Sequence, residues 1–337
     1  MKEKVIMQGL ASANNYICTG QKVKAIEVIS AINQLNPNSD LTKKLMNLTF
    51  FEELQIEKPD LNEYFGSFWI GESLEGKSIQ VFCDQGIGDT LNLLRYLKKL
   101  KSKYDCKIVL NCYAFYNEFE RFMELQNSYI DEFTAFHVKC DYFTNIMCVP
   151  SFLNDDKSED VLEFNYPANF KYILKYNMPD QISNIDYGNY FEKESSKKRV
   201  GLTWGSNKQN PLAVLKSIPM DVFEKIKCED FDFYCLQPNV QTPSWINSVE
   251  IKDILDTARL INSMDLVISV DTAVLHLAGI LNKKTLGLIH LESDPRWAGD
   301  SCAWYESVEL IRQIEKNDWS DVVQKVKDYL VIFSNND

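Results

Sequence analysis

DQGIGDT, residues 84–90, is the stretch that decides the fold. It follows SIQVFC at 78–83, an apolar run that predicts a strand. Behind it, four leucines recur at helical spacing and predict a helix from Thr90: Leu91, Leu94, Leu97 and Leu100. Gly86 and Gly88 let the backbone approach a ligand closely, and the start of a helix presents unpaired N–H groups. The stretch therefore predicts a strand-to-helix turn that can hold a ligand.

A second junction of the same kind lies far downstream, in VISVDTAVLHL at residues 267–277. Between and around the two junctions, apolar runs alternate with helical patterns from about Phe68 onward. The expected strands are 78–83, 107–112, 200–204, 231–236, 266–270 and 285–289, and the expected helices are 117–125, 220–226, 256–264, 272–280 and 319–330. Such alternation favours an α/β fold with mostly parallel sheets flanked by helices.

The alternation falls into two series, which predict two doubly wound, Rossmann-like domains facing a cleft. We place the first domain at 66–190 and the second at 199–318, with a C-terminal helix and tail at 319–337. The polar stretch 186–198 is typical of a linker between them.

Residues 1–65 form a different, helical segment. Small and apolar residues stand there at the spacing of one tetratricopeptide repeat, ended by a proline: Ala13, Tyr16, Gly20, Ala25, Ile29, Ile32 and Pro37. One repeat is too few for a solenoid, so we expect it to pack on the next domain or to form homo-oligomer contacts. A peptide-binding groove is the less favoured alternative.

Composition excludes several classes of protein. The chain has 337 residues, 45% of them hydrophobic, which allows a substantial core. A net charge of −12 disfavours nonspecific binding to nucleic acid or anionic lipid. The nine cysteines form no Cys-x-x-Cys pair, and we expect buried, reduced thiols in a cytoplasmic protein. We expect no signal peptide, because the N-terminus lacks a basic start followed by a sustained apolar core. We expect no transmembrane segment, because Asp265, Asp271 and His276 interrupt the best candidate run.

Four blocks together resemble the glycosyltransferases of the GT-B fold, specifically the ADP-heptose transferase-like family, glycosyltransferase family 9. They are DQGIGDTLNLLRYL at 84–97, CDYFTNIMCVPSFL at 140–153, VGLTWGSN with KSIP at 200–207 and 216–219, and DTARLINSMDLVISVDTAVLHLAG at 256–279. The subgroup with N-terminal tetratricopeptide repeats is the most similar. The resemblance implies an acceptor-side N-terminal domain, a nucleotide-sugar-side C-terminal domain and chemistry in the cleft.

Asp89 matches the residue for which the resemblance implies the role of general base, taking the proton from the acceptor hydroxyl. Helix capping is the alternative, because Asp is a preferred N-cap residue. Asp84 is the reserve candidate for the base. Gln85, Gly86 and Gly88 complete the acceptor-side turn.

The second junction predicts a donor site at Asp271, Thr272, Ala273 and His276. Thr272 and His276 are four residues apart, hence on one helical face. The Thr272 hydroxyl and the N–H groups of the first turn, including Ala273, are donors for a diphosphate. Asp271 would repel phosphate, so capping or orienting the loop is its better role. His276 is either a ligand contact or a satisfied interior histidine.

Further donor-site candidates follow the strand at 200–204. Lys208 and Lys216 are the cations that can neutralise a leaving diphosphate without a metal, and solvated surface lysines are the alternative. Gln237 follows the strand at 231–236 and is a candidate for lining the nucleotide pocket. Small residues at the strand end complete the set: Thr203, Gly205 and Ser206.

The sequence offers few residues for a metal site or for aromatic stacking on a ligand. Asp230-Phe231-Asp232 has the letters of a metal-binding Asp-x-Asp, but it precedes a strand, and we expect no metal site. Trp297 and Trp304 could stack on a ligand, although core packing is the better interpretation.

The sequence thus predicts a metal-independent, inverting glycosyltransferase with no cofactor beyond a nucleoside-diphosphate sugar as donor substrate. A saccharide is the first expected acceptor, and a protein or modified DNA are alternatives. A catalytically idle binding or scaffolding protein with the same fold is the rival of a different class.

Overall fold

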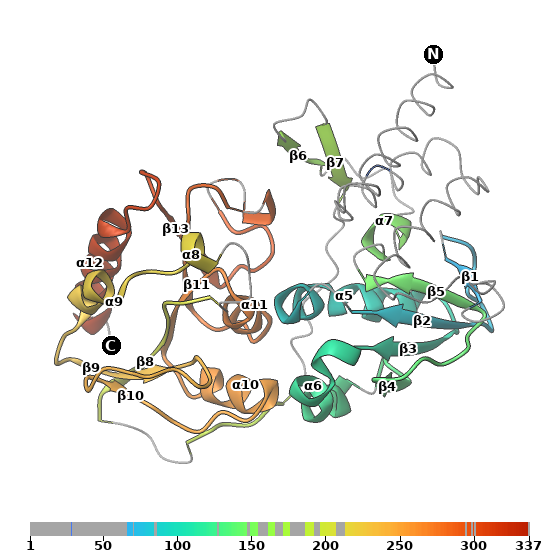
Figure 1. Ribbon diagram of the computed structural model, residues 1–337, viewed down its shortest axis with the longest axis horizontal. Coiled ribbons are helices and arrows are strands. Elements are labelled where there is room, and N and C mark those ends of the chain that lie inside the picture. Colours follow the sequence, from blue (N-terminus) through green and yellow to red (C-terminus); the bar gives the residue numbers. More distant parts are fainter. Residues whose placement is uncertain are drawn as a thin grey trace. The chain divides into compact units, whose positions relative to one another are not determined.

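The computed structural model (Figure 1) describes Val28 and most of the chain from residue 66 onward. The described ranges are 66–69, 71–83, 86–126, 128–146, 149–153, 161–165, 171–175, 186–191, 196–206, 213–293, 295–297, 299 and 301–335. The predicted tetratricopeptide-like segment lies outside them except for Val28, as do Asp84, Gln85 and Lys208.

The chain divides into two compact units. The first comprises Met1–Gly86, Leu93–Tyr116 and Gln126–Pro179. The second comprises Ile87–Asn92, Asn117–Leu125 and Asp180–Asp337. Residues 87–92, which carry most of the first junction, therefore belong to the same unit as the second junction.

The first unit contains a sheet of five parallel strands in the order β1-β5-β2-β3-β4. The strands are β1 (Ser67–Phe68), β2 (Ser78–Phe82), β3 (Lys107–Asn111), β4 (Glu132–Thr134) and β5 (Tyr142–Asn145). The chain moves outward from β2 to β3 and β4, then returns to β5 on the other side of β2. The carboxyl ends of β2 and β5 flank this reversal, which is where open α/β sheets bind ligands.

Two helices and two single turns of 3-10 helix connect these strands, and a third helix follows β5. The helices are α5 (Ile87–Lys103), α6 (Tyr116–Met123) and α7 (Val149–Leu153), and the 3-10 turns are η1 (Tyr113–Phe115) and η2 (Glu124–Gln126). The leucine stripe predicted on α5 is confirmed, because Leu91, Leu94, Leu97 and Leu100 are all fully buried. The helix begins three residues before the predicted Thr90. A separate antiparallel hairpin pairs β6 (Val161–Asn165) with β7 (Lys171–Lys175).

The second unit contains a sheet of six parallel strands in the order β10-β9-β8-β11-β12-β13. They are β8 (Lys198–Thr203), β9 (Phe231–Cys235), β10 (Ile246–Asn247), β11 (Leu266–Val270), β12 (Thr285–Ile289) and β13 (Val308–Arg312). In chain order this reads 3-2-1-4-5-6, the doubly wound arrangement of dinucleotide-binding sheets. Its reversal point lies between β8 and β11.

Helices and 3-10 turns cover this second sheet. They are α8 (Ala213–Lys216), α9 (Met220–Phe223), η4 (Glu224–Ile226), α10 (Ile254–Asn262), α11 (Ala273–Ile280), η5 (Pro295–Trp297) and α12 (Ser320–Asn335). Strand β11 is buried along its whole length, which explains its continuous apolar run. The apolar side of α12 packs into the same core through Val322, Val323, Val326 and Leu330.

The start of the expected linker packs on α10. Tyr187 is 4% exposed and stacks on Phe122 with ring centroids 5.2 Å apart. The Tyr190 N–H donates to the hydroxyl of Ser263 at 2.9 Å. Residues 186–191 are therefore not a linker free of contacts, because the aromatic side chain of Tyr187 packs in the interior of the second unit.

The described cysteines confirm the expected thiols. All seven are free, and five of them are buried: Cys83, Cys106, Cys112, Cys140 and Cys235. Cys18 and Cys148 lie outside the described residues. In the part of the chain that the structure describes, no helix has the length and apolar character needed to cross a membrane.

Candidate functional site

The carboxyl ends of β8 and β11 lie side by side at the reversal point of the second sheet. Thr203, the last residue of β8, pairs in register with Ser269 of β11. Beyond these ends, Gly205 and Ser206 continue from β8, and Asp271 continues from β11. The two predicted donor-site segments are therefore neighbours, at the edge where such sheets bind nucleotides.

The loop after β8 is fixed by side chains from outside it. The amide oxygen of Gln237 accepts hydrogen bonds from the N–H of Trp204 at 2.8 Å and of Gly205 at 3.1 Å. The Ser217 hydroxyl accepts from the N–H of Ser206 at 3.0 Å. A Cβ at Gly205 would lie 3.2 Å from the Gln237 amide nitrogen, so the glycine permits this close approach. Gln237 thus shapes the loop, and a direct contact with a nucleotide stays a prediction.

The start of α11 combines helix N–H groups with a held lysine. Thr272 is the N-cap residue, but its side chain makes no capping hydrogen bond. Lys216 Nζ lies 2.6 Å from Asp271 Oδ2, and the two side chains are 14% and 7% exposed. Lys216 is therefore not a solvated surface lysine. Asp271 orients it beside a helix start, an arrangement that favours an anionic ligand.

His276, one turn into α11, lies in the interior at 2% exposure. Its Nδ1 is 2.9 Å from the Tyr305 hydroxyl, which donates to Asn92 Oδ1 at 2.9 Å. Because the hydroxyl hydrogen is directed to Asn92, Nδ1 is the donor to the Tyr305 oxygen. The ring also packs on Trp297, with centroids 5.0 Å apart. Of the two interpretations left open by the sequence, this geometry favours the satisfied interior histidine.

The helix starts of the two strand-to-helix junctions, in α5 and α11, meet inside the second unit. A Cβ at Gly88 would lie 3.0 Å from His276 Cδ2 and 3.5 Å from Ala273 Cα. The first turn of α5 therefore packs directly on the first turn of α11, and the absence of a side chain at Gly88 allows it. Segments far apart in the sequence are joined at their helix starts.

Asp89 stands in the first turn of α5, two residues beyond the start of the helix. Gly86 is the N-cap residue, so the capping interpretation of Asp89 is wrong. Helix α5 begins earlier than its leucine stripe predicts, and this shifts Asp89 inside it. Asp89 Oδ1 lies 2.6 Å from Nη1 of Arg296, with the side chains 24% and 20% exposed.

Arg296 is a site residue that sequence reasoning missed. It lies in η5, in the connection from β12 to β13. No local pattern assigns it to the site, because only its partner far away in the sequence gives it a role. Trp297 beside it attracted attention as an aromatic residue, and its full burial confirms the core-packing interpretation, as does the 4% exposure of Trp304.

Residues 252–328 match the family model of glycosyltransferase family 9 (heptosyltransferase). The family-9 segment contains α11, Arg296 and Tyr305. No curated protein matches the chain in sequence.

Solved structures align with about three quarters of the chain, beyond the family-9 segment. The dodecameric iron-containing heptosyltransferase TibC in complex with ADP-D-beta-D-heptose aligns with a TM-score of 0.51 at 9% identity, covering 78% of each chain. A family 9 glycosyl transferase from Veillonella parvula aligns with a TM-score of 0.49 at 11% identity, over 79% of this chain and all of that one. E. coli ADP-heptose LPS heptosyltransferase II gives 0.46 at 13% identity, over 76% and 98%. The TibC alignment shows an α/β fold of the kind found in GT-B heptosyltransferases. The family-model match of residues 252–328 supports glycosyltransferase activity.

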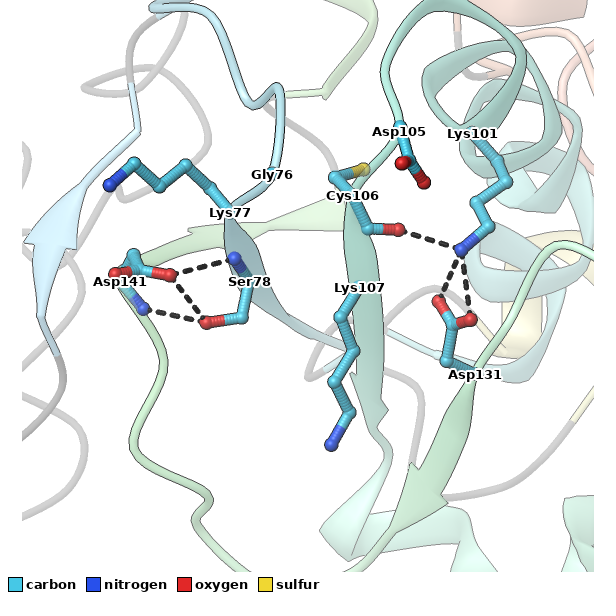
Figure 2. A pocket seen from close by; sticks show the side chains of 9 residues that line it. All are labelled: Gly76, Lys77, Ser78, Lys101, Asp105, Cys106, Lys107, Asp131 and Asp141. Atoms are coloured by element: carbon cyan, nitrogen blue, oxygen red, sulfur yellow. Dashed lines mark hydrogen bonds and ion pairs between the residues drawn. The ribbon is translucent and has the colours of Figure 1, made fainter.

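A cavity of about 450 Å3 lies elsewhere, at the amino-terminal edge of the first sheet (Figure 2). Lys101 lines one side of it and donates to the Cys106 carbonyl at 2.6 Å and to Asp131 at 2.7 Å. Asp141 accepts hydrogen bonds from the N–H and the hydroxyl of Ser78, both at 2.8 Å. These groups satisfy one another, and burial raises the pKa of the Cys106 thiol to about 11. These contacts therefore stabilise the starts of the strands, and none of the predicted site residues lines the cavity.

Metal ligands are also missing from the described residues: they contain no group of three or more His, Cys, Asp or Glu side chains that could hold an ion. Asp230 of the Asp-x-Asp letters is exposed, and Asp232 is half-buried.

Proposed function

We propose that this protein transfers a sugar from a nucleoside-diphosphate sugar to an acceptor hydroxyl, without a metal ion and with inversion at the anomeric carbon. The observation that carries the proposal is the packing of Gly88 against Ala273 and His276. It brings a carboxylate, Asp89, to a helix start that is suited to a diphosphate.

The donor would bind at the reversal point of the second sheet. Its diphosphate accepts hydrogen bonds from the first-turn N–H groups of α11 and from the Thr272 hydroxyl, and Lys216 neutralises part of its charge. Thr203 is 1% exposed, and its hydroxyl has no hydrogen-bond partner among the described residues, which makes it a further candidate donor at the strand end.

The reaction would proceed by direct displacement. Asp89 takes the proton of the acceptor hydroxyl as its oxygen bonds to the anomeric carbon. The bond from that carbon to the diphosphate oxygen breaks, and the leaving diphosphate keeps its electron pair. Lys216 and the helix N–H groups stabilise that charge as it develops. Because attack and departure occur on opposite sides of the carbon, the configuration inverts.

A saccharide is the acceptor we favour, with a protein or modified DNA as alternatives. Homo-oligomer formation through residues 1–65 and a cytoplasmic location remain predictions from the sequence. For the donor, ADP-heptose is the first probe, since the TibC structure holds ADP-D-beta-D-heptose.

The test combines binding and turnover. Nucleoside diphosphates and their sugar conjugates are screened by thermal shift, because a ligand of the native state at 100 times its Kd stabilises it by about 2.7 kcal/mol. We expect Asp89→Asn to bind the stabilising nucleotide as the wild type does while losing transfer by at least about 100-fold. Undiminished turnover of Asp89→Asn would remove the carboxylate from the mechanism.

A second variant tests the donor site. Lys216→Ala should weaken nucleoside-diphosphate binding by about 10-fold or more in calorimetry, because it removes the cation and leaves Asp271 unpaired. Lys225→Ala removes an exposed lysine of η4 and serves as the control. Equal affinities for the two variants would reject this donor site. If no nucleotide or nucleotide-sugar binds or is hydrolysed, the idle binding protein becomes the better account.

A further inference from the structure

Arg296 contacts the one carboxylate to which we assign proton transfer. The 2.6 Å pair joins its Nη1 to Asp89 Oδ1. Both side chains are only partly buried, and ion pairs in such places add little to stability. We therefore expect Arg296 to act mainly by orienting the Asp89 carboxylate, and less by stabilising the fold.

The backbone on both sides of the Arg296 side chain is anchored. The Trp304 indole N–H donates to the Arg296 carbonyl at 2.9 Å. Trp297, the next residue, is fully buried against the His276 ring. Arg312 donates to the Trp297 carbonyl and, at 2.8 Å, to the Gly299 carbonyl. The guanidinium thus extends from a backbone that hydrogen bonds hold in place on both sides.

The same connection holds α5 at a second point. The Tyr305 hydroxyl donates to Asn92, which lies three residues after Asp89 on the same side of the helix. Tyr305 in turn is bonded to His276 of α11. The first turn of α5 is therefore fixed through Asn92, while the Asp89 side chain is oriented separately, by Arg296.

We infer that Arg296 is a positioning residue for Asp89: it holds the carboxylate in the rotamer from which the other oxygen receives the acceptor proton. This inference rests on the proposed function. It predicts a loss in kcat rather than in donor binding, because the ion pair orients the base and does not hold the donor. Misplacement of a reacting group by 1 Å can cost about 100-fold in rate.

The experiment measures kcat, donor KM and thermal unfolding for Arg296→Ala, Arg296→Lys and the double variant with Asp89→Asn. We expect Arg296→Ala to lower kcat about 10- to 100-fold with donor KM within about two-fold, and Arg296→Lys to recover part of the loss. In the Asp89→Asn background, Arg296→Ala should cost nothing further, because the group it positions is gone. Millimolar guanidinium should partly rescue Arg296→Ala, which a purely structural role would not allow.

Arg121→Ala is the matched control. Arg121 forms an ion pair with Asp253, 2.8 Å from Nη1 to Oδ2, and neither residue belongs to this site. The kcat of Arg121→Ala should equal that of the wild type. An unchanged or raised kcat in Arg296→Ala would overturn the inference, as would a loss that adds fully to that of Asp89→Asn. Full turnover by Asp89→Asn is a different result, which would overturn the proposed function and this inference with it.

Discussion

At the scale of single residues, glycines decide which segments can touch. A Cβ at Gly279 would lie 2.3 Å from Cγ of the Tyr305 ring, far inside contact distance. The aromatic ring therefore lies flat on α11 where the helix has no side chain. This contact places the Tyr305 hydroxyl between His276 and Asn92. The absence of a side chain at Gly279 of α11 therefore permits the hydrogen bond from Tyr305 to Asn92 of α5.

Gly279→Ala should destabilise the protein by about 1–3 kcal/mol, because the new Cβ overpacks a core that cannot move aside. The measurement is urea unfolding. In a Tyr305→Leu background the same substitution should cost clearly less, since the ring that it strikes is gone. Equal costs in both backgrounds would show that the contact with the Tyr305 ring does not set the effect.

At the scale of elements, α10 illustrates how a helix start is specified. Asp253 is its N-cap residue, and the carboxylate accepts from the Asp256 N–H at 2.9 Å. The same side chain pairs with Arg121 of α6 at 2.8 Å and is only 7% exposed. One aspartate thus satisfies a helix N–H and ties two helices of the second unit together.

Asp253→Ala should lower the free energy of unfolding by about 1–2 kcal/mol, the usual cost of a lost N-cap with an added loss of the Arg121 contact. Chemical denaturation of the two proteins measures it. The control is Asp321→Ala in the first turn of α12, which removes an exposed pair with Lys325 and should cost no more than about 0.5 kcal/mol. A similar loss in both variants would contradict the capping argument.

At the scale of the whole molecule, each of the two sheets has its own reversal point, and the first is braced by carboxylates at its amino-terminal edge. Burial opposes ionisation of Asp131, but hydrogen bonds from Lys101 and from the Ile108 N–H outweigh it and lower its pKa. Hydrogen bonds from Ser78 lower the pKa of Asp141. Both carboxylates therefore stabilise the folded chain more when they are ionised.

The consequence is a dependence of stability on acid. Since both folded-state pKa values lie below the unfolded value of about 3.9, the stabilisation is complete above that pH and is lost as the pH falls through the folded values. Urea midpoints measured from pH 7 to pH 3 should be flat above about pH 5 and fall below about pH 4. Asp131→Asn should flatten that fall. Asp105→Asn, which removes a neighbouring carboxylate on the same cavity wall, is the control, and an identical acid limb in both variants would refute the assignment.

The sequence by itself determined the elements and their class. Leucine spacing marked α5, continuous apolar runs marked β11 and β12, and glycine or threonine at strand ends marked the turns for which we propose ligand binding, because all of these signals are local. Short strands such as β1, β4 and β5 escaped prediction, since two to four residues carry no periodicity. The start of α5 also escaped, and with it the place of Asp89 inside the helix.

Only the tertiary structure decided which of these residues meet. The Tyr305–Asn92 hydrogen bond spans 213 positions of the chain, and the Asp89–Arg296 pair joins the same two regions. No local pattern encodes such a pairing, because it follows from how strands are ordered in a sheet and how closely two helices approach. Gly88 and Gly279 are visible in the sequence, but what fills the space beside them is decided by packing.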